Sequence, residues 1–188
     1  MGKENALRLS ASDVILQTAA TLFTQKGVHG TSLNDIADAA NMSKGTLYYH
    51  YPSKEQLVND IADGHIVRAT DAVFLWMGSI NREMPLREAV FTLLETLSSD
   101  AAQPLLHVVL CAEAATGNEP LEGKLSEAYR AWTVMLELGL LRANVKDTQI
   151  VLNRARLFFP MLDGYRLQNN GRLCGAQLEM LADFLAEE

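Results

Sequence analysis

The segment that follows Ser43 concentrates side chains that can contact a phosphate group or the edge of a base. Its members are Lys44, Gly45, Thr46, Tyr48, Tyr49 and His50, with only Leu47 plainly apolar. A lysine ammonium can donate to guanine O6 and N7, a threonine offers a hydroxyl or a methyl group, and a glycine lets a partner approach the backbone closely. The chemistry that this segment could perform is therefore the binding of DNA, with phosphate contacts for position and base contacts for sequence.

Two short helices joined by a tight turn are expected to hold this segment. Thr31 or Ser32 can cap the first helix, whose apolar positions fall on one face: Leu33, Ile36, Ala37 and Ala40. Asn41 tolerates positive φ in the turn, and Ser43 can cap the second helix, which runs from Lys44 to about Tyr49. This layout is typical of a helix-turn-helix. The alternative is an ordinary helical hairpin, which is common in all-α proteins but would not need so polar a second helix.

An amphipathic helix is predicted in front of this pair, because Ile15, Ala19, Leu22 and Phe23 follow helical spacing up to Lys26-Gly27. Residues 15–27 read ILQTAATLFTQKG, and residues 31–57 read TSLNDIADAANMSKGTLYYHYPSKEQL. Over roughly the first third of the chain, these strings resemble the signature of TetR/AcrR-type regulators. Asn41 stands where that family usually has Gly, and Tyr51 where it usually has Phe. Neither departure breaks the mechanism, since Asn adopts the same backbone and Tyr keeps an aromatic anchor.

The resemblance implies that residues 44–50 form a recognition helix that binds double-stranded operator DNA. Lys44 is the best candidate for reading bases, while Ser32, Tyr49, His50 and Lys54 resemble the family's phosphate-contacting positions. The complete predicted DNA-binding set is Ser32, Ser43, Lys44, Gly45, Thr46, Tyr48, Tyr49, His50 and Lys54. Structural alternatives stay open for three of them: Tyr48 could pack on the first helix, His50 could bond locally, and Lys54 could be a solvated residue in the first turn of a fourth helix.

The charge of the chain is unevenly distributed. The formal net charge is −7, yet the residues up to Tyr51 carry four basic and four acidic side chains, so the excess acid lies entirely after Tyr51. An acidic body repels DNA, which favours binding through a small local face. Because a module with so few basic residues binds weakly, we expect a homodimer that presents two modules to successive major-groove faces.

From Ser53 onward the hydrophobic pattern is helical, with no alternating stretch typical of a strand. The expected helices are about Ser53–Met77, Leu86–Ser98, Leu105–Thr116, Leu121–Leu138, Asp147–Gln168 and Cys174–Ala186, separated by breaks rich in Gly, Pro and Asn. The sequence therefore predicts an all-α protein of about nine helices. Residues 1–52 would form the helix-turn-helix domain, and residues 53–188 a helical effector-binding and dimerisation domain.

The last two predicted helices are apolar over more than one narrow stripe, which suggests two buried faces. One face would meet the core of the domain and the other a second copy of the chain, as in the isologous four-helix contact that the family uses. The alternative is that both faces are buried within one chain. The residues predicted for the dimer interface are Leu152, Ala155, Phe159, Leu162, Leu178, Leu181 and Leu185.

The middle helices are rich in aromatic and sulfur-containing side chains. The candidate pocket residues are Phe74, Trp76, Met77, His107, Cys111, Trp132, Met135, Phe158 and Met161. By pattern alone such residues are more often plain core. The resemblance reverses this balance, because it implies a small-molecule effector that binds here and lowers DNA affinity, with the fourth helix as the coupling element. His107 and Cys111 could ligate a metal, but no third ligand is identifiable, so a polar pocket contact is favoured.

Composition excludes several classes of protein. The chain is 48% hydrophobic and 21% charged, which is typical of an ordinary globular protein, and no apolar run approaches the length of a membrane span. Residues 1–5 lack the apolar core of a secretory signal, so we expect a cytoplasmic protein. Cys111 and Cys174 are interpreted as buried apolar residues. There is no phosphate loop, nucleophile elbow or metal-ligand cluster, so we expect no enzyme, cofactor or metal, and a constitutive DNA binder without an effector remains the alternative.

Overall fold

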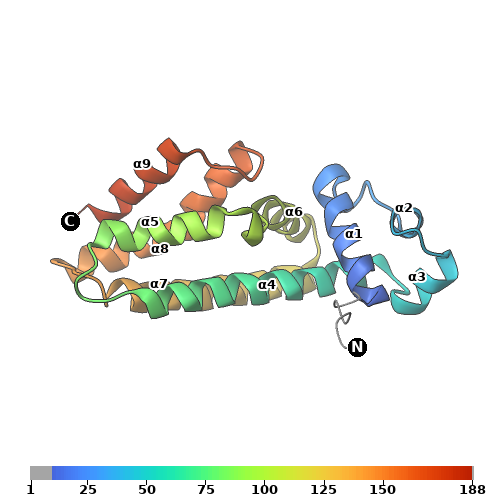
Figure 1. Ribbon diagram of the computed structural model, residues 1–188, viewed down its shortest axis with the longest axis horizontal. Coiled ribbons are helices and arrows are strands. Elements are labelled where there is room, and N and C mark those ends of the chain that lie inside the picture. Colours follow the sequence, from blue (N-terminus) through green and yellow to red (C-terminus); the bar gives the residue numbers. More distant parts are fainter. Residues whose placement is uncertain (1–9, 188) are drawn as a thin grey trace, which may run out of the picture. The chain divides into compact units, whose positions relative to one another are not determined.

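A computed structural model describes residues 10–187, and within this range the protein is built from nine α-helices and one 3-10 turn, with no strand (Figure 1). The helices are α1 (Ala11–Lys26), α2 (Leu33–Ala39), α3 (Lys44–His50), α4 (Lys54–Ser79), α5 (Leu86–Ser98), α6 (Pro104–Ala115), α7 (Glu119–Leu140), α8 (Thr148–Gln168) and α9 (Gly175–Ala186), with the 3-10 turn η1 (Asp100–Ala102) before α6. The predicted all-α class is confirmed. The predicted absence of a secretory signal concerns residues 1–5, which lie outside the described range.

The chain divides into two compact units, Met1–Asp63 and Gly64–Glu188, called unit 1 and unit 2 below. The division falls inside α4, whereas the predicted domain boundary lies at its start. At this division, a Cβ on Gly64 would meet only the Arg68 guanidinium, at 3.4 Å. No helix of the described residues is long and apolar enough to cross a membrane.

Unit 1 is organised by side chains that cap its short helices. Ser10 and Ser32 each form a capping box with the residue three positions later, at the starts of α1 and α2. Of the two caps that the sequence left open for α2, it is therefore Ser32 and not Thr31 that caps the helix. Asn41 adopts φ 53° in the turn, and the Met42 N–H donates to the Ala37 carbonyl at 2.9 Å. The turn therefore has the left-handed residue that the sequence predicted. The core of the unit contains Ile15, Ala19, Phe23, Ile36 and Leu47.

In unit 2, α5 packs against α9, and α7 packs against α6 and α8 (Figure 1). The tryptophans fix neighbouring helices through buried N–H groups: Trp76 donates to the Ala89 carbonyl at 2.7 Å, and Trp132 donates to Thr70 Oγ1 at 2.8 Å. α7 continues through Gly139, where a loop was expected, because this glycine lies against the Trp76 ring. A Cβ at Gly139 would come within 2.4 Å of that ring.

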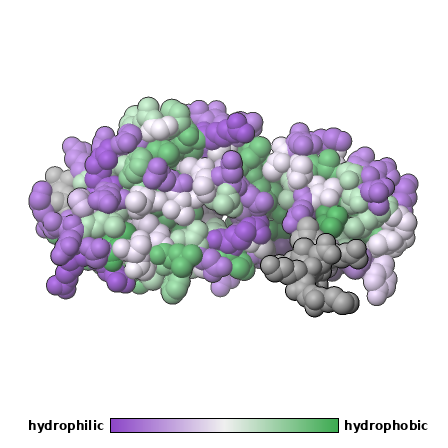
Figure 2. Space-filling view, in the orientation of Figure 1, coloured by the Kyte–Doolittle hydropathy of each residue, from purple (hydrophilic) through white to green (hydrophobic). Residues whose placement is uncertain are grey.

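The surface of unit 2 is mostly hydrophilic but is interrupted by apolar patches (Figure 2). Large apolar side chains that remain exposed on its helices are Val67, Phe74 and Leu75 on α4, Val134 and Leu138 on α7, Leu157 and Leu167 on α8, and Met180 and Phe184 on α9. The interpretation of the cysteines as buried residues is wrong for Cys174, which is exposed at the start of α9, while Cys111 is half-buried.

Candidate functional site

Helix α3 turns a single apolar side chain inward and its polar side chains outward. Leu47 is fully buried, while Lys44, Gly45 and Thr46 are exposed. Tyr49 is 84% exposed and Tyr48 46%, so Tyr48 does not take the buried position that was its structural alternative. An aromatic ring left in water has no structural benefit for its own chain. The outer face of α3 therefore brings together a cation, a hydroxyl and two phenols that are available to a partner.

Three other predicted DNA-binding residues have local partners. The Ser43 hydroxyl accepts the Thr46 N–H at 3.0 Å and lies 2.8 Å from the Thr46 hydroxyl. The Ser32 hydroxyl accepts the Asp35 N–H and lies 2.7 Å from the Asp35 carboxylate, and the hydrogen bonds from Ser32 hold the pKa of Asp35 below its usual range. His50 is half-buried, with its ring edge-on to Tyr49 at 5.3 Å. These side chains stabilise the ends of the helices that carry the exposed face.

Lys54 takes a position that the sequence did not predict. Its ammonium donates to the Val28 carbonyl at 2.9 Å and to the Thr31 carbonyl at 3.1 Å, and the side chain is half-buried. The lysine thus ties the first turn of α4 to the loop between α1 and α2. Nearby, the Tyr51 hydroxyl lies 3.0 Å from the Ser12 hydroxyl, and Tyr51 itself is buried. Both residues hold the helices of unit 1 together.

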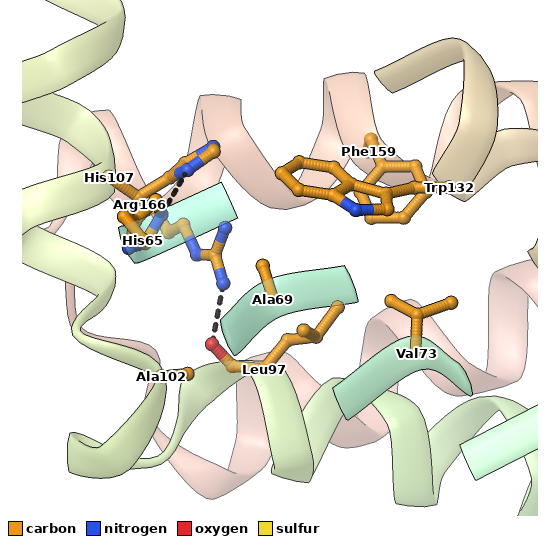
Figure 3. Close-up of a pocket in the computed structure, with 9 residues that line it drawn as sticks. All are labelled: His65, Ala69, Val73, Leu97, Ala102, His107, Trp132, Phe159 and Arg166. Carbon is orange, nitrogen blue, oxygen red and sulfur yellow. Dashed lines mark hydrogen bonds between the residues drawn. The ribbon is translucent and has the colours of Figure 1, made fainter. Parts of the chain in front are cut away.

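Unit 2 contains a small buried cavity of about 20 Å³ (Figure 3). One end is polar and is formed by His65 of α4, His107 of α6 and Arg166 of α8; Trp132 and Phe159 form the apolar end. The remaining wall residues are Ala69, Val73, Leu97 and Ala102. All three polar side chains are at most 5% exposed, so they are removed from water. Buried polar and charged groups of this kind require partners.

A hydrogen-bonded chain connects the two histidines to a carboxylate. His65 Nε2 lies 2.9 Å from His107 Nδ1, and His107 Nε2 lies 2.7 Å from the Tyr129 hydroxyl and 3.4 Å from Asp163 Oδ1. The Tyr129 hydroxyl donates to the other oxygen of Asp163. Burial lowers the pKa of His107, but its contacts with Asp163 and Cys111 outweigh burial and raise it to about 9. At neutral pH His107 is therefore a cation.

The same charges also shift the pKa values of the other residues in this hydrogen-bonded chain. Burial, followed by the charge of His107, lowers the pKa of His65 to about 3, so His65 is neutral. Burial raises the pKa of Asp163, but the hydrogen bond and charge of His107 outweigh it and lower the pKa below its usual value. Burial and the Asp163 charge raise the pKa of Tyr129 far above its usual value.

Arg166, which lies about one turn after Asp163 on α8, also bonds to this hydrogen-bonded chain. Its Nη1 donates to Asp163 Oδ1 at 3.1 Å. Its Nη2 donates to the Leu97 carbonyl at 2.5 Å, a bond that Figure 3 draws. The arginine therefore fixes α8 to the end of α5 as well as to the carboxylate. Among the described residues, no group of three or more His, Cys, Asp or Glu side chains is arranged to hold a metal.

Two open grooves lie beside this cluster. A groove of about 370 Å³ runs between α6 and α8 past His107, Cys111 and Asp163, and a wider one of about 890 Å³ lies over α7 and α8 past Cys111, Tyr129 and Asp163. Since His107 lines both the smaller groove and the buried cavity, the polar cluster separates the cavity from the surface.

Comparison with known proteins agrees with the geometry of unit 1. A family described as "Bacterial regulatory proteins, tetR family" matches residues 15–61, which include all of α2 and α3. The HTH-type transcriptional regulator LmrA of Bacillus subtilis is 29% identical over 154 residues, which is 74% of this chain and 78% of LmrA. Residues 15–61 therefore form a helix-turn-helix of the TetR family.

Other relatives are similar to this chain over shorter segments. The repressor KstR2 of Mycolicibacterium smegmatis is 46% identical over 52 residues, 28% of this chain. For KstR2 and for the probable acrEF/envCD operon repressor of Escherichia coli, the match spans only about a quarter of the relative's length. Similarity to these proteins is therefore strongest in the helix-turn-helix.

Solved structures extend the likeness in fold to nearly the whole chain. A TetR transcriptional regulator from Legionella pneumophila has a TM-score of 0.74 at 19% identity, covering 95% of this chain and 97% of the other. AibR, solved in complex with isovaleryl coenzyme A and operator DNA, has a TM-score of 0.66 at 22% identity, covering 94% and 96%. At these identities the comparison shows a common fold.

The predicted pocket residues occupy three kinds of position in unit 2. His107 and Trp132 line the buried cavity, and Cys111 lines the open grooves. The buried or half-buried members that pack in the core are Trp76, Met77, Met135, Phe158 and Met161. Phe74 points outward and is 59% exposed. The selection by aromatic and sulfur chemistry missed His65, Arg166 and Asp163, although charged residues within the largely apolar α8 were a usable signal.

The residues predicted for the dimer interface are mostly covered within the single chain. Those that are buried are Ala155, Phe159, Leu162, Leu178, Leu181 and Leu185, whereas Leu152 is half-buried. This is the arrangement expected if both apolar faces are intramolecular. The reason is that α9 packs on α5 as well as on α8 and buries its apolar side chains there. On these two helices, the apolar side chains left to a partner are Leu157, Leu167, Met180 and Phe184.

Proposed function

We propose that this chain is a sequence-specific DNA-binding transcriptional regulator that represses its target and is released by a small-molecule effector. The observation that carries the proposal is the outer face of α3, where Lys44, Thr46, Tyr48 and Tyr49 are exposed around a single buried anchor, Leu47. Helix-turn-helix proteins place such a face in the major groove. Relatives that match this segment, such as KstR2, are transcriptional repressors.

Within the groove, we assign Lys44 and Thr46 to base edges and the two tyrosines to the sugar-phosphate backbone. Gly45 supports this assignment, because a Cβ there would meet only the Ser43 hydroxyl, at 3.8 Å. The fold of the chain itself therefore leaves room for a side chain at this position. A glycine is what a closely approaching DNA backbone requires.

The test begins with selection of binding sites from random duplexes, followed by binding isotherms on the selected site. Lys44→Ala should weaken specific binding by about 1–3 kcal/mol and relax the preference at one base position. Lys146→Ala, an exposed lysine of unit 2, is the matched control and should bind as the wild type does. Selection that enriches no site, or a Lys44→Ala variant with unchanged affinity and preference, would remove the proposal.

We further propose that unit 2 receives the effector. AibR, which shares the fold, was solved with both isovaleryl coenzyme A and operator DNA, and this supports an effector for the present chain. The buried cavity with its polar end supports the same assignment. A ligand that binds the folded state raises its melting temperature by mass action, so a thermal-shift screen detects the effector. Regulation requires that the same ligand change the affinity for the selected duplex, whereas a constitutive binder would show no change.

We also propose that the active form is a cytoplasmic homodimer. One small helix-turn-helix makes few phosphate contacts, and a dimer with two of them binds DNA more tightly. The proposed contact uses the exposed apolar residues of α8 and α9, among them Leu157 and Phe184. Leu157→Glu should yield a monomer in light scattering, while Leu75→Glu, at a 72% exposed position of α4, should leave the dimer intact. A wild-type protein that is monomeric at micromolar concentration would contradict the homodimer.

A further inference from the structure

Arg166 and His65, at the polar end of the buried cavity, each have a side-chain nitrogen atom that lacks a partner among the described residues, Nε and Nδ1 respectively. Arg166 is 5% exposed and His65 2%, so bulk water does not reach these nitrogen atoms. A buried donor without an acceptor is costly. Native structures tolerate such a group mainly where a ligand, an ion or a water molecule completes it.

The hydrogen-bond chain determines which proton His65 carries. His107 is a cation, so both of its ring nitrogens donate, and its Nδ1–H must donate to His65 Nε2 at 2.9 Å. His65 is neutral, and therefore its single proton resides on Nδ1, the atom without a partner. The residues at the polar end of the cavity thus carry two unpaired N–H donors, on different helices.

The charges around the cavity favour an acceptor that is negative. His107 and Arg166 are cations and Asp163 is an anion, which leaves one positive charge uncompensated in the buried cluster. Arg68, an exposed residue of α4, adds to the positive potential at His65, and its guanidinium donates to the Gln103 side-chain oxygen at 2.7 Å. Buried charges are stable when paired, so an anion completes this site.

The other end of the cavity selects for hydrocarbon. Trp132 and Phe159 close it, with Val73 beside them (Figure 3). We propose that the effector of this regulator is a short-chain monocarboxylate, with its carboxylate held by Arg166 Nε–H and His65 Nδ1–H and its hydrocarbon chain directed toward Trp132 and Phe159. This inference rests on the proposed function, because it names the chemical class of the effector. The cavity of about 20 Å³ is close to the space of one water molecule. The acid therefore displaces the surrounding side chains as it binds.

The test is a calorimetric titration of the purified full chain with butyrate, butyramide and butylamine, at a constant ionic strength set with sodium chloride. The three compounds have similar size and differ in charge. Butyrate should bind at least about tenfold more tightly than the neutral amide, since hydrogen bonds to a charged acceptor contribute more than neutral ones. The amine should not bind. Equal binding of acid and amide, or no butyrate binding at millimolar concentration, would overturn the inference.

Variants locate the site. His65→Phe keeps a ring but removes the donor, and Arg166→Lys keeps the charge but removes Nε–H; each should weaken butyrate binding by about tenfold or more. Arg142→Gln, which removes one positive charge at an exposed position of unit 2 outside the cavity wall, is the control and should change affinity much less. If His65→Phe or Arg166→Lys does not fold, the comparison of butyrate with butyramide in the wild type still tests the inference. Folded variants that bind butyrate as tightly as the wild type would contradict the assignment.

Binding to the selected duplex is measured separately, so the two proposals fail in different ways. A chain that binds DNA through Lys44 but treats acid and amide alike keeps its proposed role as a regulator and loses the carboxylate effector. A chain that binds butyrate at Arg166 but no duplex keeps the carboxylate site and loses the proposed regulatory function.

Discussion

Replacement of Lys54 by Met tests whether this lysine stabilises the fold of unit 1 or binds a DNA phosphate. Met keeps most of the aliphatic stem and removes the donor to the carbonyls of Val28 and Thr31. The Val28 carbonyl also accepts the Thr31 N–H at 3.3 Å. It therefore keeps one hydrogen-bond partner in the variant, and the free-energy cost at this carbonyl is smaller than at Thr31. The Thr31 carbonyl belongs to a residue that is 1% exposed, and a buried acceptor left without its partner costs about 1–3 kcal/mol. We expect Lys54→Met to destabilise unit 1 by about 2 kcal/mol.

The assay can separate the two units of the chain. Both tryptophans, Trp76 and Trp132, lie in unit 2, so tryptophan fluorescence reports unfolding of that unit. Amide hydrogen exchange in α1 and α2 reports unit 1. Lys54→Met should increase exchange in unit 1 by an amount equivalent to about 2 kcal/mol, with little change in the fluorescence transition. Lys26→Met, at an exposed position of unit 1, is the matched control and should stay within about 0.5 kcal/mol of the wild type.

The salt dependence of binding to nonspecific duplex DNA distinguishes a structural role of Lys54 from a contact with phosphate. A lysine that neutralises a phosphate contributes about 1 to the slope of log K against log salt concentration. If Lys54 acts through the fold, Lys54→Met lowers affinity at every salt concentration and leaves this slope unchanged. Unchanged hydrogen exchange together with a slope smaller by about 1 would refute the reasoning and make Lys54 the phosphate contact that the sequence suggested.

Two further predictions concern unit 2. Gly139→Ala should destabilise the protein by about 1–3 kcal/mol in urea unfolding, because its Cβ would lie within 2.4 Å of the Trp76 ring; Gly123→Ala in the same helix meets nothing within 4 Å and should not destabilise. The folded pKa of His107, about 9, exceeds the ordinary value of 6.5, so its protonation stabilises the fold below pH 6.5 and this contribution is lost as pH rises through 9. The wild type should therefore lose roughly 1–3 kcal/mol more stability than His107→Gln over that interval, and parallel profiles would count against a charged His107.

The helices were predictable because their signals are local. Serine caps, the Asn41 turn and the Gly- and Pro-rich breaks each act within a few residues, and the predicted helices agree closely with the observed bounds. Gly139 was misread for the opposite reason. Glycine usually marks a helix end, but here it provides room for Trp76, which is distant in sequence. A contact of this kind cannot be inferred from helical spacing.

The DNA-binding face of α3 could be predicted from the sequence more completely than the cavity of unit 2. The face of α3 is formed by consecutive residues of one helix, so their types and spacing indicate a DNA-binding surface directly. The partners of Lys54 are backbone carbonyls, which have no sequence signature. The cavity gathers His65, His107 and Arg166 from three helices, and only packing brings them together. For the same reason, the apolar stripes of α8 and α9 could not distinguish burial within one chain from burial against a second copy.

The position of His65 links the carboxylate inference to regulation. His65 lies on α4, the helix that begins at Lys54, while the other proposed donor, Arg166, lies on α8. An acid held between them acts on α4 directly, and because the cavity is so small, it binds best to a conformation in which these helices have moved apart. A ligand shifts an equilibrium only through its different affinity for the two conformations. If that conformation binds DNA less well, thermodynamic linkage requires duplex DNA to weaken acid binding by the same factor as the acid weakens DNA binding. A rigid cavity that bound the acid without movement would give no coupling, so the small volume of the cavity is itself the reason to expect regulation through α4.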